Sequence, residues 1–312
     1  MKETVQLGNR TVADERQDDS VLARIDQYEL MREVVRNGFG AVYLAKDNAV
    51  DAECAVHVLT PYVRGDPGAM ACIRRSFAVS SRLVHANIAR TQALHLAREI
   101  RYGSEDIGRR LRIEPGDMLI VMAFAPGVSL AQWRRQFPGR TVPMAQALEV
   151  VRQMAAALDY AHGQNTLHLD VSPANAMVET RPDGKLVVRL LNFGLSAAIR
   201  SAMAYALHYT HDVQGVRPYT APEQYNGNRL GPAADQYSLA VVFHELFAGE
   251  VPFVGIGARD PVATVCEINR GMVPLDSDIQ GAVRVALTRA LDRKPESRFA
   301  SCADFVAALE NK

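Results

Sequence analysis

The stretch His168-Leu169-Asp170-Val171-Ser172-Pro173-Ala174-Asn175 decides the fold, together with Asn192-Phe193-Gly194 downstream of it. The segment before it carries apolar residues at steps of three and four: Leu148, Val151, Ala155 and Leu158. That spacing predicts an amphipathic helix, and Pro143 near its start suits a first helical turn. Further on, residues 235–247 are apolar almost all round, which predicts a helix buried on most sides. The stretch therefore lies in a helix-rich part of the chain.

Strand signals dominate the chain before residue 123. Apolar and β-branched runs predict strands over residues 28–30, 41–45, 54–59 and 119–122. A helix from about Pro67 to Leu83 interrupts them, and the polar, glycine-dotted residues 98–117 are expected to form a loop insertion. Strands first and helices after predict an α+β fold, with a small β-rich lobe on a larger α-helical lobe.

Composition narrows the class of protein. The chain has 312 residues, of which 48% are apolar and 22% charged, as is usual for a soluble globular protein. Its formal net charge is zero, so nothing favours nucleic acid or an anionic membrane as a bulk partner. No apolar run approaches the ~18 residues of a membrane span. We expect a cytoplasmic protein.

Charge and periodicity suggest how the chain is divided. Residues 1–26 are charged and poorly periodic, and we expect a flexible tail there. Residues 27–312 are expected to form one bilobal domain, with the small lobe over 27–123 and the large lobe over 124–312. The cysteines lie far apart without metal-ligand spacing, which favours buried reduced thiols: Cys54, Cys72, Cys266 and Cys302.

These stretches resemble, in order and in spacing, the bacterial branch of the eukaryotic-like (Hanks-type) Ser/Thr protein kinases. In that family, residues 168–175 correspond to the catalytic loop and residues 192–194 to the metal-binding Asp-Phe-Gly. Four later segments carry the resemblance further: 219–224, 235–239, 249–253 and 292–299. The resemblance runs from about Gln27 to the C-terminus and implies a bilobal protein-kinase-like fold.

The resemblance also implies that the phosphate and metal apparatus is degenerate. Val35 and Asn37 replace the first two glycines of the phosphate loop, His57 the phosphate-gripping lysine, Ser76 its glutamate partner, Ser172 the catalytic-loop lysine, and Asn192 the metal-binding aspartate. An imidazole is shorter than a lysine and mostly neutral near pH 7. An amide offers Mg²⁺ only a dipole, whereas one unit charge ~4 Å from a divalent ion is worth about 8 kcal/mol at a dielectric near 20, before desolvation. Affinity for Mg·ATP should fall by orders of magnitude.

Other family positions keep their residues. Asp170 matches the catalytic base and Asn175 the second metal ligand, although a carboxylate there also serves to hold the loop by backbone hydrogen bonds. The resemblance implies scaffold roles for His168, Glu223, Asp235 and Arg298. Leu169 replaces the arginine that usually reads activation-loop phosphate.

The resemblance further implies an apolar slot for adenine, lined by Val42, Ala55, Met122 and Met177. Ordinary packing between the lobes explains the same side chains. Binding of ATP or ADP without metal therefore stays open, while no metal or other cofactor is expected.

Two functions remain in competition. The preferred one is a catalytically inactive pseudokinase that binds a protein, namely an active kinase, a phosphopeptide-reading module or its own copy. Its contact surface would be the large lobe, the helix near Ser76 or the 98–117 insertion. The alternative is a weak or unorthodox nucleotide-dependent transferase that uses Asp170 and Asn175, with Lys46 as a substitute for His57.

Overall fold

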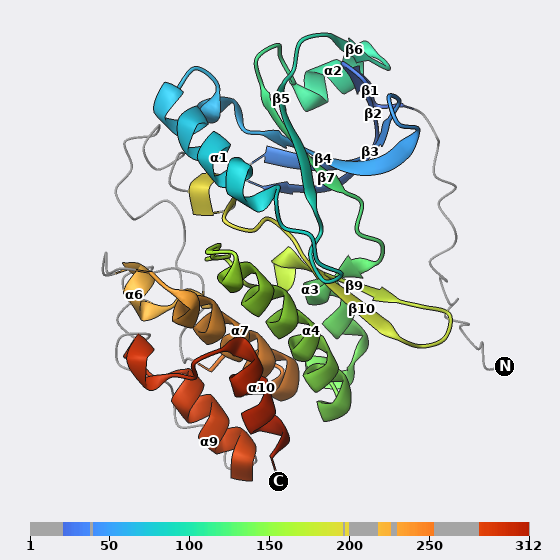
Figure 1. The fold of residues 1–312 in the computed structure, drawn as a ribbon. Coiled ribbons are helices and arrows are strands. Elements are labelled where there is room, and N and C mark those ends of the chain that lie inside the picture. The colour runs from blue at the N-terminus through green and yellow to red at the C-terminus, as the bar shows by residue number, and fades with distance from the viewer. Residues whose placement is uncertain are drawn as a thin grey trace, which may run out of the picture.

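The computed structural model describes residues 21–37, 40–195, 197–199, 218–225, 230–252 and 281–311. Strands gather in the upper lobe and helices in the lower lobe, as Figure 1 shows. The predicted α+β bilobal architecture is therefore confirmed. The chain passes from one lobe to the other after Ala123, where the last strand of the upper sheet ends.

The small lobe is built on one antiparallel sheet. Its strands are β1 (Ala23–Ile25), β2 (Tyr28–Asn37), β3 (Gly40–Asp47), β4 (Ala52–Leu59), β5 (Thr91–Leu96), β6 (Ile100–Tyr102) and β7 (Met118–Ala123). They are ordered β5-β7-β4-β3-β2-β1-β6. Successive side chains on a strand point to opposite faces, so Ala41, Tyr43 and Ala45 of β3 share one buried face.

The sheet curls on itself. Strands β5 and β6 stand at opposite ends of the strand order, yet only residues 97–99 separate them along the chain. Two contacts join the ends: the Tyr28 hydroxyl hydrogen-bonds His95 Nε2 at 2.9 Å, and the Asp26 N–H donates to the Glu99 carbonyl at 2.9 Å. Burial, aided by the nearby charge of Asp47, raises the pKa of Tyr28 to about 12.

The predicted tail boundary at Asp26 lies too far along the chain. Strand β1 pairs with both β2 and β6, and Ala23 and Ile25 are fully buried in the lobe. Their alternation around exposed Arg24 gives a three-residue strand one inward face. Residues 1–20 lie outside the described part of the chain.

The predicted loop over residues 98–117 is also corrected. It contains β6 and the helix α2 (Glu105–Leu111). The Ser104 side chain caps that helix by accepting the Ile107 N–H. Ile107 and Leu111, four residues apart, lie on one side of the helix and pack into the core under the sheet.

Helix α1 (Pro67–Ser80) occupies the place predicted for the small-lobe helix. The Asp66 carboxylate accepts the Ala69 N–H at 2.9 Å, and Pro67 takes the first turn, where a missing N–H costs nothing. Ile73 is the buried centre of its inner face. The helix lies beside β5 in Figure 1.

The large lobe is mostly helical. Its elements are β8 (Val128–Ser129), α3 (Leu130–Trp133), α4 (Met144–Gly163), β9 (Ala176–Thr180), β10 (Leu186–Leu190), α6 (Pro222–Tyr225), α7 (Pro232–Ala248), α9 (Gly281–Ala290) and α10 (Cys302–Glu310). Helix α7 is buried from Ala234 to Leu246, in line with its apolar sequence. Among the residues that the structure describes, no helix is long and apolar enough to cross a bilayer.

Candidate active site

Three predicted site residues meet at the junction of the lobes. The Asn175 amide donates to the Asp170 carboxylate at 2.7 Å and to the Asp170 carbonyl at 2.8 Å. The Asn192 amide donates to Asn175 Oδ1 at 3.4 Å. Asn192 has φ 64°, a left-handed conformation that asparagine tolerates better than most residues. The catalytic-loop carboxylate and the two amides thus form one hydrogen-bonded chain.

Asp235 holds the backbone of this loop. Its carboxylate accepts the N–H of His168 at 2.8 Å and of Leu169 at 2.7 Å, and also bonds His162 Nε2 at 2.8 Å. Leu169 has φ 60°, which costs a branched side chain about 1–2 kcal/mol. Asp235 therefore fixes a backbone shape that leucine would not adopt by itself.

Two buried histidines flank the loop and differ in charge. Burial lowers the pKa of His168, whose ring packs on Phe193 with 4.7 Å between centroids. Burial also opposes the charge on His162, but hydrogen bonds to Asp159 and Asp235 outweigh it and raise its pKa to about 9. One imidazole is therefore neutral and the other cationic at pH 7.

The Arg298 guanidinium binds the Glu223 carboxylate through two hydrogen bonds of 2.7 and 2.9 Å. It also donates to the carbonyls of Ala233 and Asp292 at 2.9 and 2.7 Å. Both partners are buried, so each charge depends on the other. The pair ties α6 to the segment between α9 and α10.

The phosphate side of the site carries little charge. His57 is buried in β4, opposite Val42 in the β3 register. The Ser172 hydroxyl is buried, and no hydrogen-bond partner reaches it within the described part of the chain. Val35 is half exposed at a bulge of β2, and Ser76 lies partly buried on α1. Gly38, Phe39 and the Asn37 side chain fall outside the described residues.

Lys46 does not substitute for His57. Its register partner is Glu53, so it lies four residues from the His57 level of β3, about 13 Å along a strand. Its ammonium pairs instead with Asp51 at 2.6 Å on the surface. The phosphate position therefore gains no cation from this strand.

The residues expected to sandwich adenine belong to a packed cluster. Met122 is buried in it, and Val42 and Ala55 pack against it. Leu195 and Ile199, which follow the Asn192-Phe193-Gly194 turn, are 1% and 2% exposed in the same cluster. Met177 lies apart, in β9 of the large-lobe sheet.

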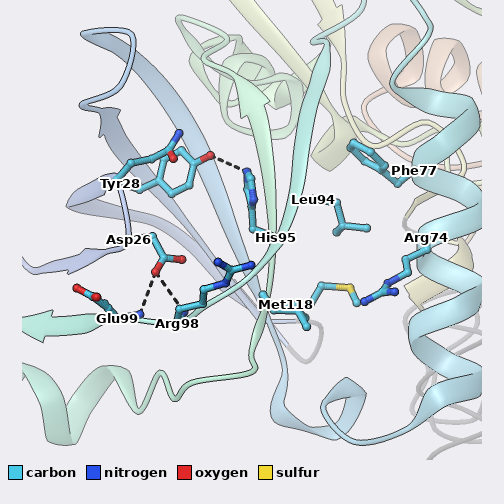
Figure 2. Close-up of a pocket in the computed structure, with 11 residues that line it drawn as sticks. Asp26, Tyr28, Arg74, Phe77, Leu94, His95, Arg98, Glu99 and Met118 are labelled. Carbon is cyan, nitrogen blue, oxygen red and sulfur yellow. Dashed lines mark hydrogen bonds between the residues drawn. The ribbon is translucent and has the colours of Figure 1, made fainter.

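Two cavities formed by described residues lie near these groups, and neither is lined by Val42, Ala55 or Met122. One of about 290 Å³ adjoins the catalytic loop and is lined by Ser172, Arg135, Arg140 and Tyr219, among others. Another, of about 800 Å³, opens between α1 and the ends of the curled sheet (Figure 2). Neither cavity could be predicted from the sequence, because each is formed by segments far apart along the chain.

The comparisons with known proteins agree with this geometry. The protein kinase domain family matches residues 28–308. Serine/threonine-protein kinase PknA of Mycobacterium tuberculosis is 30% identical over 283 residues, covering 91% of this chain and 60% of PknA. Pkn1 of Myxococcus xanthus is 29% identical, covering 95% of this chain and 40% of Pkn1.

The chain thus spans about 60% or less of these relatives' length. Among solved structures, the PknI kinase domain of M. tuberculosis superposes with a TM-score of 0.68 at 26% identity. That match covers 94% of this chain and 97% of the PknI domain. The chain therefore belongs to the protein kinase family, in its bacterial, Hanks-type Ser/Thr branch.

Proposed function

We propose that this chain is a pseudokinase, a kinase-like module that does not transfer phosphate and acts by binding another protein. The observation that carries the proposal is the packing of Leu195 and Ile199 into the cluster that holds Met122 and Ile73. Val42 and Ala55 pack on the same cluster, so the chain's own side chains occupy the surroundings of the adenine slot. Apolar packing of this kind competes directly with a nucleotide base.

The hydrogen bonds between amides also support the proposal. Mg²⁺ selects oxygen ligands, preferably carboxylates. Here Asn192 turns an N–H donor toward Asn175 Oδ1, the oxygen expected to ligate a second ion. Asp170 is engaged in turn by the Asn175 amide. The donors and acceptors satisfy one another, and a metal would have to break this chain.

The cavity beside α1 suggests where a partner binds (Figure 2). Arg74 of α1 and Arg98 of the 98–117 segment border it, and neither guanidinium has a carboxylate partner among the described residues. Its apolar lining includes Phe77, Leu94 and Met118. Asp26 and Glu99 also line the cavity, on the side of Arg98, whereas Arg74 lies on the α1 side (Figure 2). We infer a partner segment that places an acidic side chain at Arg74 and apolar side chains against the apolar lining. We place this binding in the cytoplasm.

A thermal-shift titration with ATP, with and without Mg²⁺ or Mn²⁺, tests the proposal. A ligand at 100 times its dissociation constant would stabilise the fold by about 2.7 kcal/mol. We expect no shift under any of these conditions. Incorporation of labelled phosphate at a rate that Asp170→Ala abolishes would overturn the proposal.

The arrangement of Asp170 and Asn175 favours one alternative, a slow nucleotide-dependent transferase. The base and its neighbouring amide lie in hydrogen-bond contact. A shift with ATP alone would indicate nucleotide binding without metal. A shift only with Mn²⁺, accompanied by phosphate or nucleotide transfer, would favour the transferase.

A further inference from the structure

A cluster of potential metal ligands lies behind the catalytic loop, in the large lobe. Asp159 and His162 stand three residues apart on one side of α4, and Cys302 is the first residue of α10. The carboxylate, imidazole and thiol each offer a ligand atom, and these atoms lie within 4.8 Å of one another. Cys302 is far from α4 along the sequence, so the spacing of the cysteines predicted no metal site.

The surroundings orient the imidazole for ligation. His162 Nε2 bonds the Asp235 carboxylate at 2.8 Å, which leaves Nδ1 facing Asp159 Oδ1 at 3.8 Å. A carboxylate behind a ligating histidine fixes the ring and raises its basicity in many metal sites. His162 thus has the position of a ligand and Asp235 that of its supporting carboxylate. Because the ring is cationic without metal, an ion would have to displace the proton on Nδ1.

The carboxylate and the thiol are fixed at the start of α10. The two Asp159 oxygens accept the N–H groups of Cys302 and Ala303 at 2.9 Å each, and the same carboxylate is also bonded by the His162 ring and the Cys302 thiol, whose protons an ion would replace. Burial and the nearby carboxylates of Asp159 and Asp235 raise the pKa of the Cys302 thiol well above its usual range, so a metal would have to displace the thiol proton when it binds. The side chain of His162 is 8% exposed, Cys302 is 1% exposed and the Asp159 side chain is 27% exposed. The cluster therefore has a buried floor and one side open to solvent.

We propose that Asp159, His162 and Cys302 bind a divalent transition-metal ion of the zinc class, with water as the fourth ligand on the open side. A mixed nitrogen, sulfur and oxygen donor set suits Zn²⁺, with bonds of about 2.0–2.3 Å. Bonds of this length require the ion to draw the three donors closer together than they lie here.

The site would act on the catalytic loop through Asp235. That carboxylate bonds His162 on one side and the N–H groups of His168 and Leu169 on the other. An ion on His162 therefore fixes the support of the loop backbone. This role needs neither nucleotide nor phosphate transfer, so it stands apart from the proposed function.

Titration of the metal-stripped full chain with Co²⁺ at pH 8 tests the site. We expect one equivalent to produce the visible bands of tetrahedral cobalt and a thiolate-to-cobalt charge-transfer band, both removed by Zn²⁺. Cys302→Ala should remove the charge-transfer band and weaken binding at least 100-fold. Cys72→Ser is the matched control, because it removes a more exposed thiol on α1 and should leave both unchanged.

Absence of the charge-transfer band in the unaltered chain would overturn the site, whether or not the Cys302 variant folds. A band that persists in a folded Cys302→Ala variant would also overturn it. Hydrogen exchange tests the link to the loop. Zn²⁺ should slow exchange of the His168 and Leu169 amides at least several-fold, and unchanged exchange with metal bound would refute the role of Asp235.

Discussion

Replacing Asn192 by aspartate would put back the charge that a metal needs, at a cost that the structure allows us to work out. Asn175 bridges residue 192 and Asp170 through bonds of 3.4 and 2.7 Å, so the new carboxylate would lie within about 8 Å of Asp170. At a dielectric near 20, that repulsion is worth about 2 kcal/mol. The lost hydrogen bond to Asn175 adds about 0.5 kcal/mol. Without metal, the unfolding free energy should fall by about 2–3 kcal/mol.

Metal should reverse this loss. Mn²⁺ or Mg²⁺ at 100 times its dissociation constant would return about 2.7 kcal/mol to Asn192→Asp, and nothing to the unaltered chain. Urea unfolding with and without the ion measures both quantities. ATP should need more, because a lysine at buried position 57 requires an anionic partner. We expect nucleotide binding only when His57→Lys and Ser76→Glu are added.

Asn165→Asp provides the matched control. Asn165 is exposed and also has a positive φ of 54°, so the substitution is chemically and conformationally the same. It should change the unfolding free energy by less than about 0.5 kcal/mol. If Asn192→Asp costs no more than this control, or if metal fails to stabilise it, our electrostatic account of the site is wrong.

Three further predictions concern the scaffold, all measured by urea unfolding. Arg298→Met should lower the unfolding free energy by about 3–5 kcal/mol, because it leaves Glu223 buried and unpaired. Adding Glu223→Leu should recover much of that loss, and an equal loss in the single and double variants would contradict the pairing. Burial, outweighing a backbone hydrogen bond, lowers the pKa of His244. The stability that the neutral, buried ring contributes is therefore present above about pH 6.5, and it is lost as the pH falls through the lower pKa of the folded state. His244→Gln should therefore flatten the decline in stability between pH 7 and pH 5, and parallel curves would argue against it. Gly127→Ala should cost at least about 2 kcal/mol of unfolding free energy, because φ is +101° and a Cβ would lie 2.1 Å from the Val178 carbonyl oxygen. Gly163→Ala, where a Cβ meets open space, should instead gain about 0.5–1 kcal/mol. The reverse order would refute the steric argument.

Much of the fold could be predicted because its signals are local and repeated. The apolar sequence of α7 and the order of strands before helices are legible without tertiary information. Asp170, Asn175 and Asn192 could be expected together because their spacing matches a known family, and the structure does bring them into contact. Whether the site is inactive stays a prediction.

The missed elements have weak local signals. Strand β1 is only three residues long, too short for alternation to stand out beside a charged tail. Helix α2 contains Gly108 and sits in polar sequence, so its helical character is weak along the chain, and the Ser104 cap is seen only in the structure. The cluster of Asp159 with Cys302 arises only when α4 meets α10, and no pattern along the chain records that meeting.

The small-lobe sheet curls until its two ends meet, so the contacts between these ends hold it closed. These contacts are the Tyr28–His95 and Asp26–Glu99 hydrogen bonds, which lie beside the cavity of about 800 Å³. Two hydrogen bonds hold this closure, whereas α7 is held by buried packing. We therefore expect sub-global opening of the fold to begin between the ends of the sheet and to leave α7 intact. A ligand or peptide that contacts both ends of the sheet would fix how tightly the sheet closes. Because α1 lines the same cavity, it would also fix the position of α1 relative to the lobe junction.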